Sequence, residues 1–280
     1  MATIPRTPLA MSVPLAILAA VAAGAGALDP DLYSRDLEHF GVQAAAQDWV
    51  TLLVAVPALL ALGFTAWRGS RAAWLLWHGA VLYLAYTYAI ASFMVQFNGL
   101  FLVYTTTFGL AFLTLAASLA TAIRNTPAEA FGPRWPRRTV AGTLWAIVAM
   151  FAFLWLSDIV PALLDGTAPG SLAESGTPTN GIEVLDLAIL LPTLALTGAW
   201  MLRRLVRGYV LAMAALAFAA LLALALVAMV AGLVAAGLAE SAAPAAVFAL
   251  LAAGAGVLAV LAARATASEP ARERTEAIAA

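Results

Sequence analysis

The chain contains no cysteine among its 280 residues, and only 10% of them are charged. The absence of cysteine excludes disulfides, thiolate metal sites, Cys-x-x-Cys redox chemistry and a cysteine nucleophile. The scarcity of charge excludes a water-soluble fold, because soluble domains are about a quarter charged and about half apolar, whereas this chain is 64% hydrophobic. Composition therefore indicates an integral membrane protein.

Signature motifs of enzymes and metal sites are also absent. The sequence has no His-Glu-x-x-His, no phosphate-binding Gly-x-x-x-x-Gly-Lys-Ser/Thr and no Gly-x-Ser-x-Gly. Its two histidines, His39 and His78, are expected on opposite sides of the membrane, which excludes a shared metal or a bis-histidine haem. We expect no metal and no cofactor, and enzymatic activity is not indicated.

Eight apolar stretches are each about long enough to cross a bilayer. They cover residues 8–27, 49–67, 72–95, 100–123, 140–163, 184–202, 209–238 and 243–263. The predicted fold class is an all-α, polytopic membrane helix bundle of about eight transmembrane helices. An alternative for the first stretch is a cleaved signal peptide, which would leave seven spans.

The charge of the connecting segments changes sign at every crossing. One set holds nearly all the arginines: Arg6, Arg68, Arg71, Arg124, Arg134, Arg137, Arg138, Arg203, Arg204, Arg207, Arg264, Arg272 and Arg274. The other set is acidic: Asp29, Asp31, Asp36, Glu38, Asp48, Asp165, Glu174, Glu183 and Glu240, with Arg35 as its one base. Arginine-rich loops stay in the cytoplasm, so we expect both termini inside a bacterial plasma membrane. This topology accounts for the arginines, and no nucleic acid partner is expected.

The sequence also indicates an internal duplication. Pro57, Gly63, Arg68 and Trp74 recur at the same spacing as Pro192, Gly198, Arg203 and Tyr209. The hypothesis is a 4+4 repeat of residues 1–135 and 136–280, related by a pseudo-twofold axis along the membrane normal. Chance recurrence in a chain of low complexity is the alternative.

Polar side chains concentrate in the third and fourth stretches. At 100° per residue, His78, Tyr88, Ser92 and Gln96 share one face of a helix. Lipid cannot satisfy such a face, so it must meet protein or water. Either it forms hydrogen bonds between helices, or it lines a ligand site toward the outer side. The residues of that site would be Tyr88, Ser92, Gln96, Asn98 and Tyr104.

Three ionisable residues need separate interpretations. Asp158 and Asp186 are expected at similar depth, where two close carboxylates would bind a cation or ligand. Alternatively both are solvated, with Asp186 in the favourable first turn of its helix. His78 is a candidate proton relay, or a neutral imidazole bonded to a neighbouring helix.

Three functions remain open. The first is a carrier or ligand-binding membrane protein for a small molecule or cation, with its site toward the outer face. The second is a structural or accessory subunit whose last two spans, rich in alanine and glycine, bind a second copy or a membrane partner. The third is a membrane-embedded enzyme acting on lipid or quinone. All three place the chain in a lipid bilayer.

Overall fold

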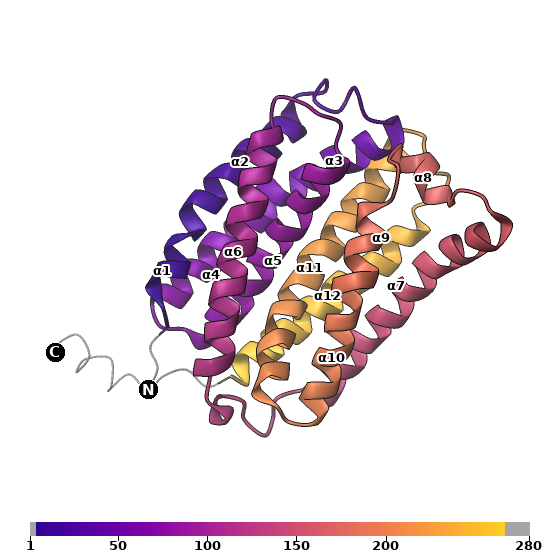
Figure 1. Cartoon of the computed structure of the whole chain (residues 1–280). Coiled ribbons are helices and arrows are strands. Elements are labelled where there is room, and N and C mark those ends of the chain that lie inside the picture. Colours follow the sequence, from indigo (N-terminus) through magenta and orange to yellow (C-terminus); the bar gives the residue numbers. More distant parts are fainter. Residues whose placement is uncertain (1–3, 267–280) are drawn as a thin grey trace.

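A computed structural model describes residues 4–266, and within that range the chain forms helices and no strand. The first half contains α1 (Arg6–Ala10), α2 (Ser12–Leu28), α3 (Glu38–Val50), the π-helical turn η1 (Thr51–Ala55), α4 (Val56–Trp67), α5 (Arg71–Met94), α6 (Phe101–Asn125) and the 3₁₀ turn η2 (Ala128–Ala130). The second half contains α7 (Arg137–Asp165), α8 (Gly170–Ser175), α9 (Gly181–Leu185), the π-helical turn η3 (Asp186–Leu190), α10 (Leu191–Leu202), α11 (Val206–Ala235) and α12 (Ala243–Arg264). These elements join into long helical rods that lie side by side (Figure 1).

The predicted all-α class is confirmed, and the long apolar helices are consistent with a membrane bundle. Within residues 4–266, seven rods are long and apolar enough to cross a membrane. The remaining rod, α5, has 24 residues, but its tyrosines, tryptophans and histidine lower its hydropathy. This helix packs against α4, α6 and α11, and Trp77, His78 and Tyr83 in it are completely buried. A helix surrounded by protein does not need the apolar surface of a lipid-facing one.

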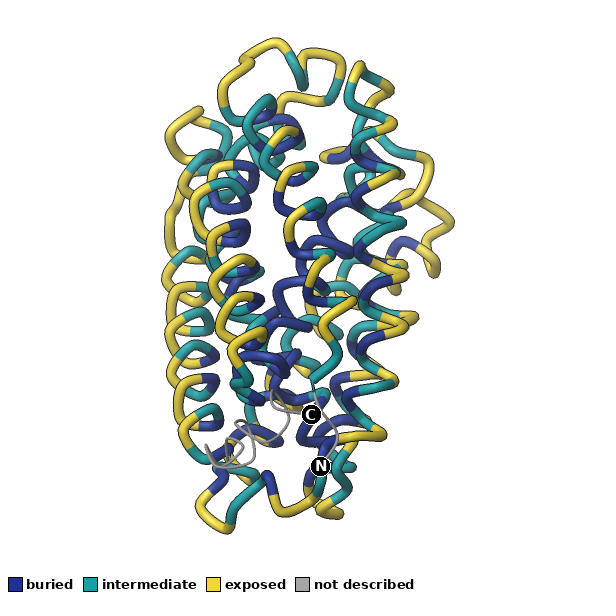
Figure 2. Tube along the Cα trace, turned by 90° about the vertical axis from the view of Figure 1, so that its left-hand side faces the viewer, coloured by how far each residue is buried: buried dark blue, intermediate teal, exposed yellow. Residues whose placement is uncertain are grey.

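Each long helix has a buried side and an exposed side along its length. Buried residues follow the interior of the bundle, and exposed residues follow its outer surface (Figure 2). The exposed side chains on α7 and α12 are large and apolar, among them Phe153, Leu164, Leu250 and Val257. This is the reverse of a soluble protein's surface and is what contact with hydrocarbon requires.

The two ends of the bundle carry opposite charge. The loop of residues 29–37 and α8 lie at one end, and the turns from α6 to α7 and from α10 to α11 lie at the other (Figure 1). The first is the acidic end and the second the arginine end. Among residues 4–266 the exceptions are Arg35 at the acidic end and Glu129 at the arginine end.

A π-helical turn precedes each of two prolines. In η1 the N–H of Val56 donates to Thr51 O, and in η3 the N–H of Leu191 donates to Asp186 O. Proline lacks an N–H and its ring crowds the preceding turn, and a widened turn is one way to relieve that crowding. Pro57 and Pro192 each stand as the second residue after such a turn.

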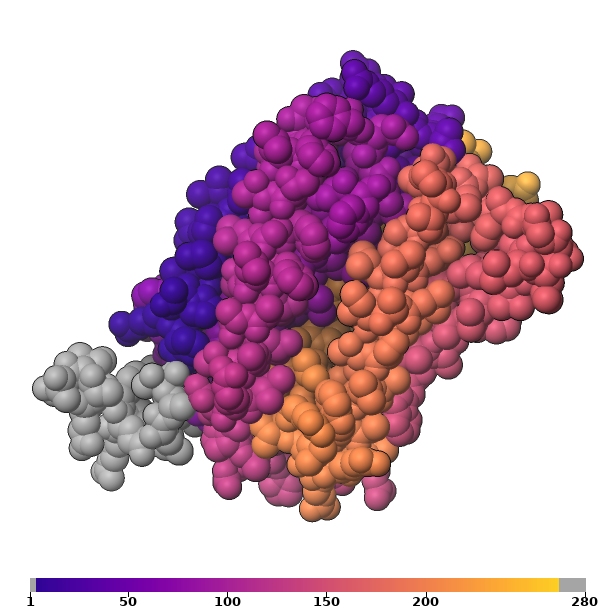
Figure 3. All heavy atoms as spheres, in the orientation of Figure 1, coloured from indigo at the N-terminus to yellow at the C-terminus, as the bar shows by residue number. Residues whose placement is uncertain are grey.

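Helix starts recur at a constant separation along the chain. η1 and η3 begin 135 residues apart, and so do α4 and α10, and also α5 and α11. The two halves meet along α5 and α11, which run side by side. In the space-filling view the indigo-to-magenta half and the red-to-orange half form two adjoining bodies (Figure 3).

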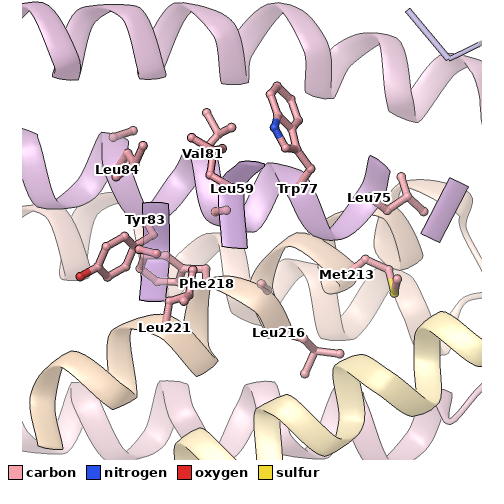
Figure 4. Packing of buried hydrophobic residues seen from close by; sticks show 14 of the residues in the cluster. Leu59, Leu75, Trp77, Val81, Tyr83, Leu84, Met213, Leu216, Phe218 and Leu221 are labelled. Carbon is pink, nitrogen blue, oxygen red and sulfur yellow. The ribbon is translucent and has the colours of Figure 1, made fainter. Parts of the chain in front are cut away.

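The contact between α5 and α11 is close because of Gly79. A Cβ on this glycine would lie 2.3 Å from the carbonyl oxygen of Ala214 and 2.6 Å from Ala217 Cβ. Small residues allow helix backbones to approach in this way. Toward the acidic end larger side chains fill the contact, with Tyr83 of α5 beside Phe218 and Leu221 of α11 (Figure 4).

Gly79→Ala is expected to lower the free energy of unfolding by about 1–3 kcal/mol, because the nearest atoms belong to backbone that must shift. Unfolding in mixed detergent micelles measures this change. The matched control is Gly109→Ala on α6, where a Cβ meets no atom within 4 Å. The control should be neutral or slightly stabilising, since alanine is the better helix former by about 1 kcal/mol. Equal effects of the two substitutions would contradict the close approach.

Candidate functional site

A cavity of about 220 Å³ lies between the two halves at the acidic end. Residues of α3, α5 and α6 line it from the first half, and residues of α7, η3, α11 and α12 from the second. Among the described residues that line it are three carboxylates, those of Asp48, Glu174 and Asp186, and no basic side chain. The Glu174 side chain is 63% exposed, so the cavity extends from the protein surface to buried acidic groups.

Asp186 connects the two halves through its carboxylate. The residue is 4% exposed and begins the π-helical turn η3. The Tyr86 hydroxyl of α5 donates to Oδ1 at 2.8 Å, and the Trp155 Nε1–H of α7 donates to Oδ2 at 2.9 Å. Each oxygen thus has one neutral donor, and no cationic side chain in the described part of the chain forms an ion pair with the group.

Asp48 is the second buried carboxylate, 7% exposed, on α3. The Tyr33 hydroxyl, from the loop before α3, donates to its Oδ2. Burial and the nearby Asp48 carboxylate raise the pKa of Tyr33 above its usual range, so this phenol stays protonated and remains a donor. The preceding residue, Gln47, donates from Nε2 to Thr87 Oγ1 at 2.9 Å, which fixes α3 against α5.

Two of the predicted site residues, Tyr88 and Tyr104, line the cavity. The Tyr88 hydroxyl donates to the carbonyl oxygen of Ala19 at 3.0 Å, and the Tyr104 ring stacks beside it with centroids 6.2 Å apart. The Tyr104 hydroxyl is buried without a hydrogen-bond partner in the described structure. A donor or acceptor on a bound molecule would satisfy it.

Three other predicted residues, Ser92, Gln96 and Asn98, do not line this cavity. The Ser92 hydroxyl donates to the carbonyl of Tyr88, one turn earlier, at 2.6 Å. Gln96 is exposed beyond the end of α5, and Asn98 Oδ1 accepts the N–H of Leu100 just before α6. Ser92 and Asn98 thus bond to nearby backbone groups, and neither faces the cavity.

Asp158 and Asp186 have separate partners. The Asp158 oxygens accept the N–H groups of Gly170 and Ser171 at 2.9 and 3.0 Å, at the start of α8. Asp186 lines the cavity and Asp158 does not. The structure therefore gives the two carboxylates different surroundings and no shared hydrogen-bond donor.

His78 lies away from the cavity. Its Nδ1–H donates to the carbonyl of Trp74 at 2.8 Å, and its ring stands edge-on to Trp74 and Trp77. The Nε2 atom is buried without a partner in residues 4–266. The same range contains no group of three or more His, Cys, Asp or Glu placed to hold a metal ion.

Comparison with known proteins finds no matching family model, no matching curated protein and no matching solved structure.

Sequence reasoning missed Asp48, which it counted only as a loop charge. The residue stands immediately before the apolar stretch of residues 49–67. A signal for it was present in the repeated spacing, because Asp48 and Glu183 are 135 residues apart, as are Thr51 and Asp186. All four side chains are buried.

Asp36 lies at the outer edge of the polar groups around Tyr104. Its Oδ1 accepts the N–H of Gln96 at 2.8 Å, and its Oδ2 is buried without a partner in the described structure. Burial raises the pKa of this carboxyl above its ordinary value of 3.8, and the Gln96 N–H opposes the shift only in part.

Asp36→Asn should make the stability of the folded protein less dependent on pH. A raised pKa in the folded state means that the Asp36 contribution to stability is full below 3.8 and is lost as the pH rises through the folded pKa. The variant should therefore be more stable than the wild type near neutral pH, and this advantage should disappear in acid. Melting temperatures from about pH 3.5 to about pH 7 measure the difference. Asp31→Asn, at an exposed carboxylate of the same loop, should show no such pH-dependent difference.

Proposed function

We propose that the chain is a carrier-type membrane protein that binds a small organic cation from the acidic end of the bundle. The observation that carries this proposal is the cavity wall, in which Asp48 and Asp186 are buried and no side chain from residues 4–266 is basic.

Charge is the first argument for a cation. Removing a carboxylate from water costs several kcal/mol even after relaxation, and an opposite charge is the most effective compensation. Tyr33, Tyr86 and Trp155 offer neutral donors to the two carboxylates, which hold their oxygens in place without cancelling their charge. A bound cation would supply the missing positive charge between the halves.

The composition of the wall favours an organic cation over a bare metal ion. Calcium and magnesium need six or more oxygen ligands, whereas much of this cavity is lined by aromatic and aliphatic side chains such as Phe151, Trp155, Leu222 and Phe248. Aromatic faces attract alkylammonium groups through cation–π contacts. At about 220 Å³ the space is smaller than the 300–1,000 Å³ that drug-sized ligands occupy.

The location of the cavity between two related halves supports a carrier rather than a protein that only binds its ligand. Duplication of residues 1–135 as 136–280 would give two four-helix units that rock about their common face, and the recurring 135-residue separation of η1 and η3 supports it. Gly79 of α5 and Ala214 of α11, also 135 residues apart, touch each other. A contact between equivalent positions is what a twofold axis produces. We propose that this axis runs along the membrane normal.

The charge asymmetry supports an orientation in which the arginine end is cytoplasmic. Both chain termini then lie in the cytoplasm and the cavity faces outward, in a bacterial plasma membrane. An accessory subunit or a lipid or quinone enzyme would share the orientation but would not need an acidic, aromatic cavity.

Choline is a suitable probe for binding, and 3,3-dimethylbutanol is its uncharged counterpart of similar shape. Choline should change the fluorescence of Trp155, which lies in the cavity wall, and the neutral alcohol should not. Asp186→Asn should weaken choline binding at least about tenfold, the order expected when a charge-assisted contact is lost. Trp155→Phe identifies the part of the signal that comes from this residue.

Asp165→Asn is the matched control. Asp165 is the last residue of α7, and its carboxylate is exposed at the acidic end of the bundle. It should bind choline as the wild type does. Equal binding of the alcohol and of choline would contradict a cation site. Uptake of labelled choline into proteoliposomes then separates a carrier, which accumulates it, from a binding protein, which does not.

Orientation can be tested with single cysteines, because the native chain has none. Ser34→Cys at the acidic end should react with an impermeant maleimide in intact cells, and Glu129→Cys at the arginine end should react only after the membrane is opened. Both positions are exposed, so burial would not explain a lack of reaction. The reverse pattern would overturn the proposed topology.

A further inference from the structure

A second cavity, of about 540 Å³, lies at the arginine end between the α6–α7 loop and the α10–α11 turn. Its wall contains Arg137, Arg138 and Arg204, and none of the described residues that line it is acidic. The proposed transport function does not use it, because it lies at the opposite end of the bundle from Asp48 and Asp186.

The arginine side chains of this cavity have no partner within residues 4–266. No ion pair or hydrogen bond engages the guanidinium groups of Arg137, Arg138 or Arg204 in that part of the chain. The Nε atom of Arg137 is buried and lacks an acceptor there. A buried donor without an acceptor is costly, so an anionic oxygen in the cavity would be stabilising.

The backbone adds to the positive field. The first turn of α7 contributes Arg138 and Thr139 to the wall, and α11 contributes Val206. Neither helix has a side-chain cap at its N-terminus. Two long helices thus direct the positive ends of their dipoles at the space that the arginines surround.

Arg204 occupies a backbone position that favours glycine. Its φ of 57° is the one positive value at a non-glycine residue in the described chain, and it closes α10 where Leu205 N–H bonds to Trp200 O. Gly69, 135 residues earlier, closes α4 with a φ of 93°. An arginine that tolerates this strain points to a use for its charge.

Three aromatic side chains, those of Phe131, Trp135 and Tyr209, also line the cavity. The rings of Phe131 and Tyr209 stack with centroids 4.7 Å apart, and Trp135 stands edge-on to Tyr209 at 5.0 Å. Tryptophan and tyrosine are typical of the level at which lipid headgroups meet the hydrocarbon, and clusters of Arg beside membrane helices bind anionic headgroups.

We propose that this cavity binds the phosphate group of an anionic phospholipid at the arginine end of the bundle. A free phosphate carries the same chemistry, and the test separates the two sources. Delipidated protein in a nonionic detergent is titrated with phosphatidylglycerol, with phosphatidylcholine and with inorganic phosphate. Lipid-dependent thermal stabilisation and native mass spectra report binding.

Phosphatidylglycerol should bind and stabilise the wild type, and phosphatidylcholine should do so much less. Arg137→Gln and Arg204→Gly should each weaken phosphatidylglycerol binding about fivefold, the order expected for one basic residue at a lipid surface. Arg204→Gly should melt no lower than the wild type without lipid, because glycine relieves the backbone strain. A loss of binding in this variant is then not a loss of folding.

Arg68→Gln is the matched control, since Arg68 lies in the equivalent turn of the first half and outside this cavity. It should bind phosphatidylglycerol as the wild type does. If inorganic phosphate stabilises the wild type but not Arg137→Gln or Arg204→Gly in this assay, that result would support the site with free phosphate as its ligand. The proposal is overturned if the cavity variants bind like the wild type, or if Arg68→Gln weakens binding as much as they do. Neither result bears on choline binding at the acidic end.

Discussion

The close contact of α5 with α11 is the constraint on which the remaining architecture depends. Because Gly79 has no side chain, the two backbones approach until its Cα faces the carbonyl of Ala214. The contact places α5 in the interior, where a helix with Trp, Tyr and His side chains is tolerated. It also sets the separation of the two halves, and toward the acidic end that separation leaves the cavity that contains Asp186.

A second constraint is that hydrocarbon cannot satisfy polar groups. Pro57 and Pro192 interrupt their helices, and the widened turn before each proline contains a polar residue that is hydrogen-bonded to α5. Thr51 is bonded to the Tyr83 hydroxyl, and Asp186 accepts a hydrogen bond from Tyr86. The same widened turns that accommodate the prolines thus supply the polar contacts of the interior. Widened turns of this kind are frequent at functional sites.

The predicted polar face of α5 illustrates how far a sequence pattern reaches. Helical phase placed Tyr88 on a face that must meet protein or water, and in the structure Tyr88 is buried in the cavity wall with Tyr104 beside it. Phase could not show that α5 ends at Met94, which leaves Gln96 outside the helix, or that Ser92 turns back to the Tyr88 carbonyl. Asp48 was missed because hydropathy treats a carboxylate next to an apolar stretch as a loop residue, although Tyr33 and the packing of α3 bury it.

The sequence by itself determined the class of the protein and the separation of acidic from arginine loops, because hydropathy and charge act locally and need no knowledge of neighbours. It also predicted long helices with short connections, since only helices satisfy their own backbone in lipid. The tertiary structure alone decided which polar groups meet. Asp186 finds Tyr86, 100 residues away along the chain, and Arg137 and Arg204 share a cavity. Such meetings depend on the packing of whole helices, and no local pattern encodes that packing.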